Sequence, residues 1–223
     1  MRIFGLVLGL AMTALGASAA QAQATFYTVT YVEASPRDTR HATALLKNYV
    51  TAGKKDDGNV GFELVKGVHR PSWFVVIGSW RDQKAFEAHV AGTASKDMND
   101  KIKTYIAAPN DTRQHTALSF AAAQSGKAGV CAVTHVDVIP PQKDNGVAAL
   151  QQLASDSRNH QGNLQFDVWQ QTNRPNHFTV VEAWANRGSF DVHEMQKPTR
   201  EFRNKLATMT GALYDERLYK MLK

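Results

Sequence analysis

The stretch that decides the fold is RPSWFVVIGSW at residues 70–80, which recurs as RPNHFTVVEAW at residues 174–184. The two stretches lie 104 residues apart, and the same shift aligns matching residues along most of the chain without a gap. This period is too long for a solenoid, whose repeats run to roughly 20–50 residues. We therefore predict a domain that has been duplicated and fused. Other matched pairs are Val29 and Val133, Pro36 and Pro140, Leu46 and Leu150, and Phe62 and Phe166.

The first 24 residues differ in character from the rest of the chain. Arg2 precedes an apolar run at 3–15, and small residues at 17–24 offer cleavage sites. This pattern is typical of a secretory signal peptide, and its apolar part is shorter than a membrane-spanning helix. We predict cleavage after Ala22 or Ala24, with a retained membrane anchor as the alternative. The mature protein would then be exported, either periplasmic or secreted, without attachment to a membrane.

Each copy shows the same order of predicted elements. A strand rich in β-branched residues is followed by a helix, and the Arg-Pro turn then joins two further strands. A short helix, a longer helical stretch at 95–106 or 199–210 and a last strand complete each copy. This order is β-α-β-β-α-β, the ferredoxin-like unit. The predicted organisation is a signal peptide at 1–24, domains at 25–120 and 130–223, and a linker at 121–129.

The predicted fold class is α+β. Helices cover one face of each antiparallel sheet, and the apolar side chains of the other face need a partner. Two sheets packed face to face satisfy that need, so one chain could form an internal pseudo-dimer. The repeat alone leaves a second arrangement open, in which the copies pair between two chains.

Composition and motifs exclude several classes of function. The formal net charge is +6, but the basic residues are scattered, so we expect no nucleic-acid partner. The single cysteine, Cys131, cannot form an internal disulfide and lies in an apolar run, which indicates a buried thiol. The histidines lack metal-binding spacing, and no phosphate loop or GxSxG elbow occurs. We therefore expect no metal and no flavin or nicotinamide cofactor.

The repeated stretch and the helix after it resemble the antibiotic biosynthesis monooxygenase domain. The first copy has FVVIGSW at 74–80 and FEAH at 86–89, and the second has FTVVEAW at 178–184 and FDVH at 190–193. In that family an aromatic residue ends the third strand, and the next helix carries Phe and His three residues apart. The resemblance covers both copies and implies the dimeric α/β barrel fold.

The resemblance implies a range of activities. The family includes cofactor-free oxygenases of polycyclic aromatics, quinol oxygenases, haem-degrading enzymes and proteins with no known reaction. Haem-degrading members have Trp where this chain has His89 and His193, and their haem-ligating His falls where this chain has Asn99 and Arg203. The sequence therefore disfavours haem degradation.

His89 and His193 are the candidate general bases. Each follows a Phe by three residues on a short helix, so the two side chains share one helix face that points toward the core or its rim. A neutral imidazole has a reference pKa of about 6.5 and could take the proton of a phenol or hydroquinone. Deprotonation would make such a substrate electron-rich enough to reduce dioxygen. The alternative is that each His braces its helix through hydrogen bonds.

Aromatic residues beside these histidines are the candidate walls of a substrate site. Trp80 and Trp184 end the third strands, and Phe86 and Phe190 lie on the helices that follow. All four could contact a flat aromatic ligand. The alternative is ordinary core packing.

Two further matched pairs combine aromatic and histidine residues. Tyr31 and His135 occupy equivalent positions on the first strands, so Tyr31 is a candidate substrate contact and His135 a third candidate catalytic residue. The alternative for both is an outward-facing strand position. Trp73 and His177 also match, and their place beside a turn predicts a surface position.

Two functions are compatible with these features. The first is an exported, cofactor-independent monooxygenase that oxidises a small aromatic or quinol-like substrate with dioxygen. The second is a non-catalytic protein that binds an apolar ligand or acts in envelope stress, since a fold of this kind hosts many functions. The expected partner is a small aromatic or quinol-like molecule, and a homodimer of the whole chain stays open.

Overall fold

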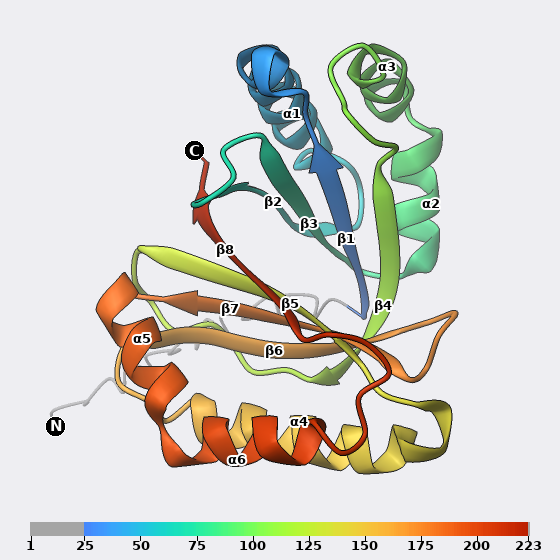
Figure 1. The fold of residues 1–223 in the computed structure, drawn as a ribbon. Coiled ribbons are helices and arrows are strands. Elements are labelled where there is room, and N and C mark those ends of the chain that lie inside the picture. Colours follow the sequence, from blue (N-terminus) through green and yellow to red (C-terminus); the bar gives the residue numbers. More distant parts are fainter. Residues whose placement is uncertain (1–24, 223) are drawn as a thin grey trace, which may run out of the picture.

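The computed structural model describes residues 25–222, which form two halves of like architecture (Figure 1). The predicted signal peptide at 1–24 lies outside the described residues. The first half comprises β1 (Phe26–Glu33), α1 (Thr39–Gly53), β2 (Asn59–Gly67), β3 (Trp73–Trp80), α2 (Gln83–Ala91), α3 (Thr93–Ile102) and β4 (Asp111–Ser119). The second half comprises β5 (Val130–Asp137), α4 (Lys143–Ser157), β6 (Asn163–Gln171), β7 (His177–Trp184), α5 (Arg187–Met195), α6 (Lys197–Leu206) and β8 (Asp215–Met221).

The short helix of each half begins at a side-chain cap. The Asp82 carboxylate accepts a hydrogen bond from the Ala85 backbone N–H at 2.8 Å. In the second half, the Asn186 side chain accepts one from the Ser189 N–H at 2.9 Å. Asp and Asn are both favoured at this position because they satisfy a helix N–H that has no partner within the helix. The two halves therefore start α2 and α5 in the same way with different residues.

The longer helix of each half ends earlier than its apolar spacing predicts. The predicted ends were residues 106 and 210, whereas α3 ends at Ile102 and α6 at Leu206. The segments that follow form isolated β-bridges, one between Ala34 and Ile106 and one between Val138 and Thr210. Pairing with the chain just after β1 and β5 thus replaces the last helical turn. Helical spacing cannot reveal such a tertiary contact.

The eight strands of residues 25–222 form one closed barrel in the order β1-β3-β2-β8-β5-β7-β6-β4. The last strand of each half joins the two sheets, because β4 pairs with both β1 and β6, and β8 pairs with both β5 and β2. These pairings close the barrel within one chain. The two ferredoxin-like repeats therefore form an intrachain pseudo-dimer. Closure also removes the free sheet edges that invite pairing with other chains.

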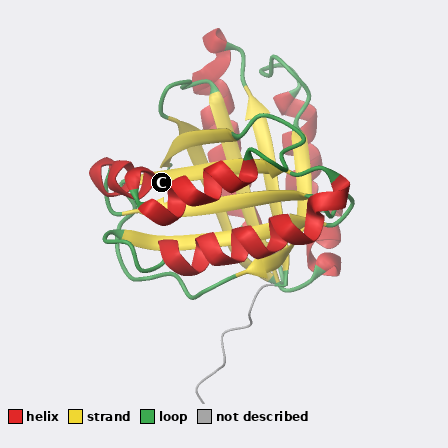
Figure 2. Cartoon of the chain, turned by 60° about the horizontal axis from the view of Figure 1, so that its bottom comes forward, coloured by secondary structure: helices red, strands yellow, loops and turns green. Residues whose placement is uncertain are grey.

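Side chains alternate between the barrel interior and the helix-covered outer face. The helices lie outside the strands (Figure 2). One core cluster fills the barrel and includes Tyr27, Cys131 and Trp169, and the rings of Tyr27 and Trp169 stack at 4.6 Å. Two further clusters lie between the helices and the outer face, one in each half, and these contain Trp80 and Trp184. The matched Trp residues therefore face the helices and not the barrel interior.

The described residues contain no helix long and apolar enough to span a membrane. Cys131 is a free, buried thiol in the barrel interior, as the sequence predicts. Burial, with a smaller contribution from the Glu63 charge, raises the pKa of this thiol to about 12. Cys131 therefore stays protonated and acts as a small apolar side chain.

Candidate active site

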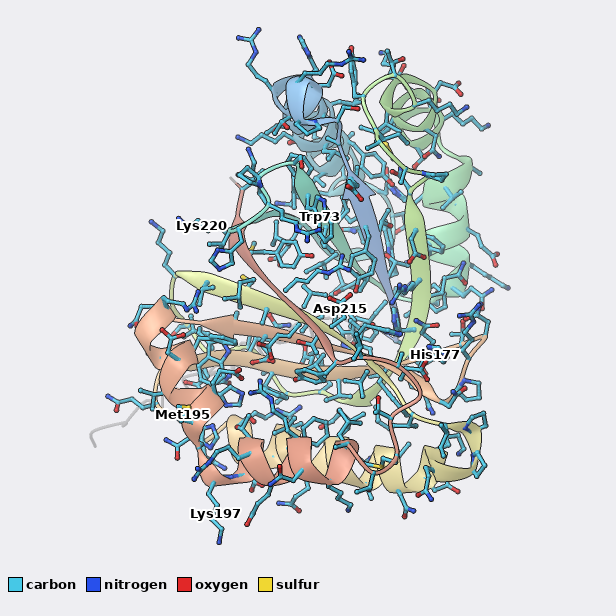
Figure 3. All side chains as sticks on the ribbon, viewed as in Figure 1. Trp73, His177, Met195, Lys197, Asp215 and Lys220 are labelled. Carbon is cyan, nitrogen blue, oxygen red and sulfur yellow. The ribbon has the colours of Figure 1, made fainter. Side chains whose placement is uncertain are left out.

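A cleft of about 820 Å³ lies where the two halves meet. Helix α5 forms one wall of the cleft, and the turn between β2 and β3 of the first half forms the opposite wall. Strand β8 runs along the cleft. Figure 3 labels Trp73 on β3 of the first half, and Met195 on α5 and Asp215 on β8 of the second. The lining residues are Gly67, His69, Arg70, Trp73, Arg187, Phe190, Asp191, Glu194, Met195 and Asp215 to Tyr219.

Helical spacing explains which side of α5 faces the cleft. Arg187, Phe190, Asp191 and Glu194 recur three or four residues apart and so lie on one helix face. Phe190 and Met195 contribute apolar surface, and Met195 is 68% exposed. Trp73 contributes an aromatic ring from the other half. The cleft is thus partly apolar, with carboxylates on the same walls.

Two of these carboxylates share one arginine. Arg203 on α6 donates to Glu194, and its Nη2 also lies 3.1 Å from Glu216 Oε2. Burial, followed by repulsion from Glu194, raises the pKa of Glu216 to about 7. A carboxyl group with this pKa is partly ionised at neutral pH, and it can accept a proton from an acidic hydroxyl.

A third carboxyl group lies deeper in the same half. Glu182 on β7 is 2% exposed, and its Oε2 accepts a hydrogen bond from Trp184 Nε1 at 2.9 Å. Burial raises the pKa of Glu182 to about 8, since the ionised form loses its hydration. The nearby charges of Glu216 and Glu194 act in the same direction. Glu182 is therefore mainly protonated at neutral pH.

His193 on α5 is buried and 2% exposed. Its ring stacks on Trp184 at 4.6 Å, its Nδ1 lies 2.9 Å from His160 Nδ1, and its Nε2 lies 3.7 Å from Glu182 Oε2. Burial, together with the charges of His160 and Arg203, lowers the pKa of His193 to about 3. His193 is therefore neutral at physiological pH.

His89 has different neighbours in the first half. Its Nδ1 lies 2.6 Å from Asp56 Oδ2, and its Nε2 lies 2.6 Å from the Tyr49 hydroxyl. A carboxylate only accepts hydrogen bonds, so Nδ1 carries a proton and donates it to Asp56. Both ring nitrogens are thus engaged within the protein. Trp80 lies against the same ring at 4.6 Å and donates to Thr28 Oγ1 at 3.2 Å.

The predicted substrate-binding residues fall into different environments. Phe190 lines the main cleft, and Phe86 packs on Phe26 in the first helix–sheet core at 5.7 Å. Trp80 and Trp184 are fully buried in the helix–sheet cores. All four are therefore core residues, and Phe190, which is 2% exposed, is the one that also borders the main cleft.

Tyr31 and His135 lie at the same end of the barrel. The guanidinium of Arg113 lies 4.8 Å from the Tyr31 ring, and Arg217 lies 5.9 Å from it. Arg217 also lies over Trp73 at 4.4 Å. His135 Nε2 lies 3.2 Å from His177 Nδ1 in a second, polar cleft. The predicted surface positions of Trp73 and His177 are therefore half-buried cleft positions, because strand pairing places both at the junction of the halves.

A family model for antibiotic biosynthesis monooxygenase matches residues 25–101 and again residues 129–205. The chain belongs to the antibiotic biosynthesis monooxygenase family. Each match falls within one half of the barrel and ends before the last strand of that half, β4 or β8. No curated protein sequence matches the chain.

Solved structures share the two-domain fold of this family member. A putative monooxygenase of Fusobacterium nucleatum has a TM-score of 0.78 at 16% identity, over 90% of this chain and 94% of its own. An anthrone oxidase-like protein has a TM-score of 0.74 at 12% identity, over 91% and 93% of the two chains. At such identities the likeness concerns the fold alone.

Sequence reasoning missed the charged residues that distinguish the second half of this monooxygenase-family protein. Glu182, Glu216 and Arg203 occupy positions whose first-half equivalents are Gly78, Thr112 and Asn99. Comparing the copies position by position could have found them, since each change introduces a charged side chain. Their proximity could not have been found in that way. Among residues 25–222, no group of three or more His, Cys, Asp or Glu residues is arranged to hold a metal ion.

Proposed function

We propose that this protein is a cofactor-independent monooxygenase whose active site is the cleft at the junction of the two halves, with its candidate base, Glu216, on the second half. The observation that carries the proposal is the cleft of about 820 Å³ on whose wall Glu216 has a pKa of about 7. Family membership supports the reaction class. A small aromatic or quinol-like substrate suits a cleft walled by Phe190, Met195 and Trp73.

The proposed chemistry begins with proton transfer to Glu216. The ionised carboxylate takes the proton of a phenolic or enolic hydroxyl, and the resulting anion gives one electron to dioxygen. The substrate radical and superoxide then form a carbon–oxygen bond, and Glu216 returns its proton to the resulting peroxide. The hydroperoxide loses water together with the hydrogen of the oxygenated carbon, which leaves a carbonyl group. One oxygen atom of dioxygen enters the product and the other leaves as water, while the substrate supplies all the electrons. Each step therefore balances without an external reductant.

Arg203 holds Glu216 and Glu194 together and thereby positions the base. Its contact to Glu216 is 3.1 Å. Removing the arginine would leave two neighbouring carboxylates with less compensation, which would raise their pKa values further. Arg203 is accordingly a positioning residue in this proposal. His193 is the competing candidate base, although its lowered pKa makes it a weak proton acceptor at neutral pH.

Oxygen uptake with a panel of hydroquinones and anthrones tests the proposal. We expect saturable uptake by the wild type and a loss of about 100-fold or more in kcat/KM for Glu216→Gln. Glu201→Gln is the matched control, because Glu201 is an exposed residue of α6 whose ion pair with Lys197 measures 3.6 Å. A large loss for His193→Ala with little loss for Glu216→Gln would move the base to the histidine. Saturable binding without oxygen uptake would support the non-catalytic ligand-binding protein instead.

Export is a separate part of the proposal and rests on residues 1–24. Expression of the full chain in a Gram-negative host should deliver mature protein to the periplasm. Intact-mass measurement should place the new N-terminus at Gln23 or Thr25, which follow the two predicted cleavage sites. A chain that keeps its first residues in the cytoplasmic fraction would contradict export.

A further inference from the structure

A second cleft, of about 410 Å³, lies at the junction of the halves and is lined almost wholly by polar side chains. It is formed by β4 of the first half and the turn between β6 and β7 of the second. His177 on β7 is the repeat equivalent of Trp73 in the main cleft, and Figure 3 labels both. The lining residues are Asp111 to Gln114, His135, Gln171 to Arg174 and His177.

The polar cleft and the main cleft are equivalent sites of the duplicated domain. Arg174 and Arg113 of the polar cleft match Arg70 and Arg217 of the main cleft. The acidic groups differ, because Glu216 of the main cleft is matched by Thr112. Duplication has therefore produced one cleft rich in carboxylates and one in which arginines outnumber them.

The arginines of the polar cleft retain unused hydrogen-bond donors. Arg113 holds Asp111 through Nε at 2.9 Å and Nη2 at 2.7 Å. Its Nη1 is buried and has no hydrogen-bond partner among the described residues. Arg174 is exposed and forms no ion pair with any carboxylate of residues 25–222. Asp111 thus pairs with Arg113, whereas Arg174 has no carboxylate within ion-pair distance among residues 25–222; the other acidic group near the cleft is Asp137, which lies beside His177.

The polar cleft also contains two histidines, His135 and His177, which lie near its arginines. His135 lies 3.2 Å from His177, whose Nε2 lies 3.5 Å from Asp137 Oδ1. Burial, followed by the charges of Arg113 and His177, lowers the pKa of His135 to about 4. Burial also lowers the pKa of His177, so neither shift favours a charged imidazole, and both rings offer hydrogen-bonding groups.

We propose that the polar cleft binds a small oxyanion, either a carboxylate or a phosphate. The planar guanidinium fork matches the geometry of both groups. Gln114 and Asn173 offer amide N–H donors on the same walls. A metal cation would meet Arg113 and Arg174 at close range, so the charge of the site disfavours it. This site is distinct from the proposed active cleft and does not depend on the monooxygenase activity.

Isothermal titration calorimetry with succinate and with inorganic phosphate tests the proposal in a buffer free of both. The wild-type protein should bind at least one of them with saturation at one site per chain. Arg174→Gln should weaken that binding about tenfold or more, which is the loss expected when a charge-assisted hydrogen bond is removed. Arg70→Gln, the repeat-equivalent substitution in the main cleft, should leave it unchanged. Comparing the two titrations separates a carboxylate site from a phosphate site.

Nuclear magnetic resonance locates the bound anion independently. Addition of the tighter ligand should shift the imidazole carbon-bound proton signals of His135 and His177 but not those of His89. Absence of saturable binding by the wild type would overturn the proposal. Equal weakening by Arg174→Gln and Arg70→Gln would also overturn it, because the anion would then be held by general positive charge or by the main cleft.

Discussion

The indole of Trp184 donates a hydrogen bond to Glu182, two residues earlier on the same strand, at 2.9 Å. The equivalent indole of Trp80 donates to the Thr28 hydroxyl at 3.2 Å. The repeat-equivalent tryptophans thus donate to different kinds of group, a neutral hydroxyl in the first half and an ionisable carboxyl group in the second. Together with Arg203 and Glu216, Glu182 gives the second half a group of charged or ionisable residues that the first half lacks at the equivalent positions.

Glu182 should make stability depend on pH. Its folded-state pKa of about 8 lies above the ordinary value, so the folded state keeps a proton that the unfolded state releases. The folded state therefore loses stability as pH rises toward the folded pKa. Glu216, with a pKa of about 7, also lowers stability as the pH rises. The lowered pKa of His193 affects stability only below about pH 6.5, where the histidine of the unfolded chain becomes protonated.

Between pH 6.5 and pH 8, the change in stability therefore reports the raised carboxyl pKa values without the opposing effect of the histidines. Urea denaturation should show a free energy of unfolding that falls across this range, by at most roughly 1.4 kcal/mol per pH unit for each proton involved. Glu182→Gln should flatten the fall, since glutamine does not titrate. A slope that is unchanged in the variant would show that Glu182 is not the group responsible.

The rate of oxygenation should rise with pH if Glu216 is the base. Only the ionised carboxylate accepts a proton, so kcat/KM should increase about tenfold per pH unit below its pKa and level off above it. With a pKa of about 7, the midpoint should lie near neutrality. Oxygen uptake measured from pH 5.5 to 8.5 gives the profile. A plateau that already begins at pH 5.5 would reject Glu216 as the base.

Tyr49→Phe should destabilise the protein without involving the proposed active cleft. The substitution removes the hydroxyl that lies 2.6 Å from His89 Nε2 and leaves that buried nitrogen with only the longer contact of 3.3 Å to Ser95 Oγ. The expected cost is about 1–2 kcal/mol in the free energy of unfolding. Tyr105→Phe is the control, because its half-buried ring stacks on His41, and it should change stability by less than about 0.5 kcal/mol. Equal effects of the two substitutions would argue against the Tyr49–His89 bond.

A chain truncated to residues 25–120 should not remain a folded monomer. It would expose the interior faces of β1, β2 and β3, which carry Tyr27, Val65 and Val75 of the barrel core. It would also leave β2 without β8 and β4 without β6. We expect dimers or larger assemblies in light-scattering measurements on a size-exclusion column. A monomer that unfolds cooperatively would contradict the reliance of each half on the other.

Several features of the fold could be predicted because their causes are local. Alternation of apolar residues indicates strands, and Asp82 and Asn186 mark the starts of α2 and α5. The ends of α3 and α6 could not be predicted, because bridges to the segments after β1 and β5 replace the last helical turn. Burial of His89 and His193 was expected from their spacing to Phe, but the partners of each ring were not.

The sequence by itself determined the duplication, the order of elements in each half and the family resemblance. These properties depend on residue spacing along the chain, which is the same whether or not the chain is folded. Only the tertiary structure decided that the halves close one barrel, that the matched tryptophans face the helices, and that Glu216 and Trp73 share a cleft. Glu216 and Trp73 come from different halves, and the pKa of Glu216 depends on burial and on neighbouring charges. Such properties exist only once β8 lies beside β2, because strand pairing brings the two residues together.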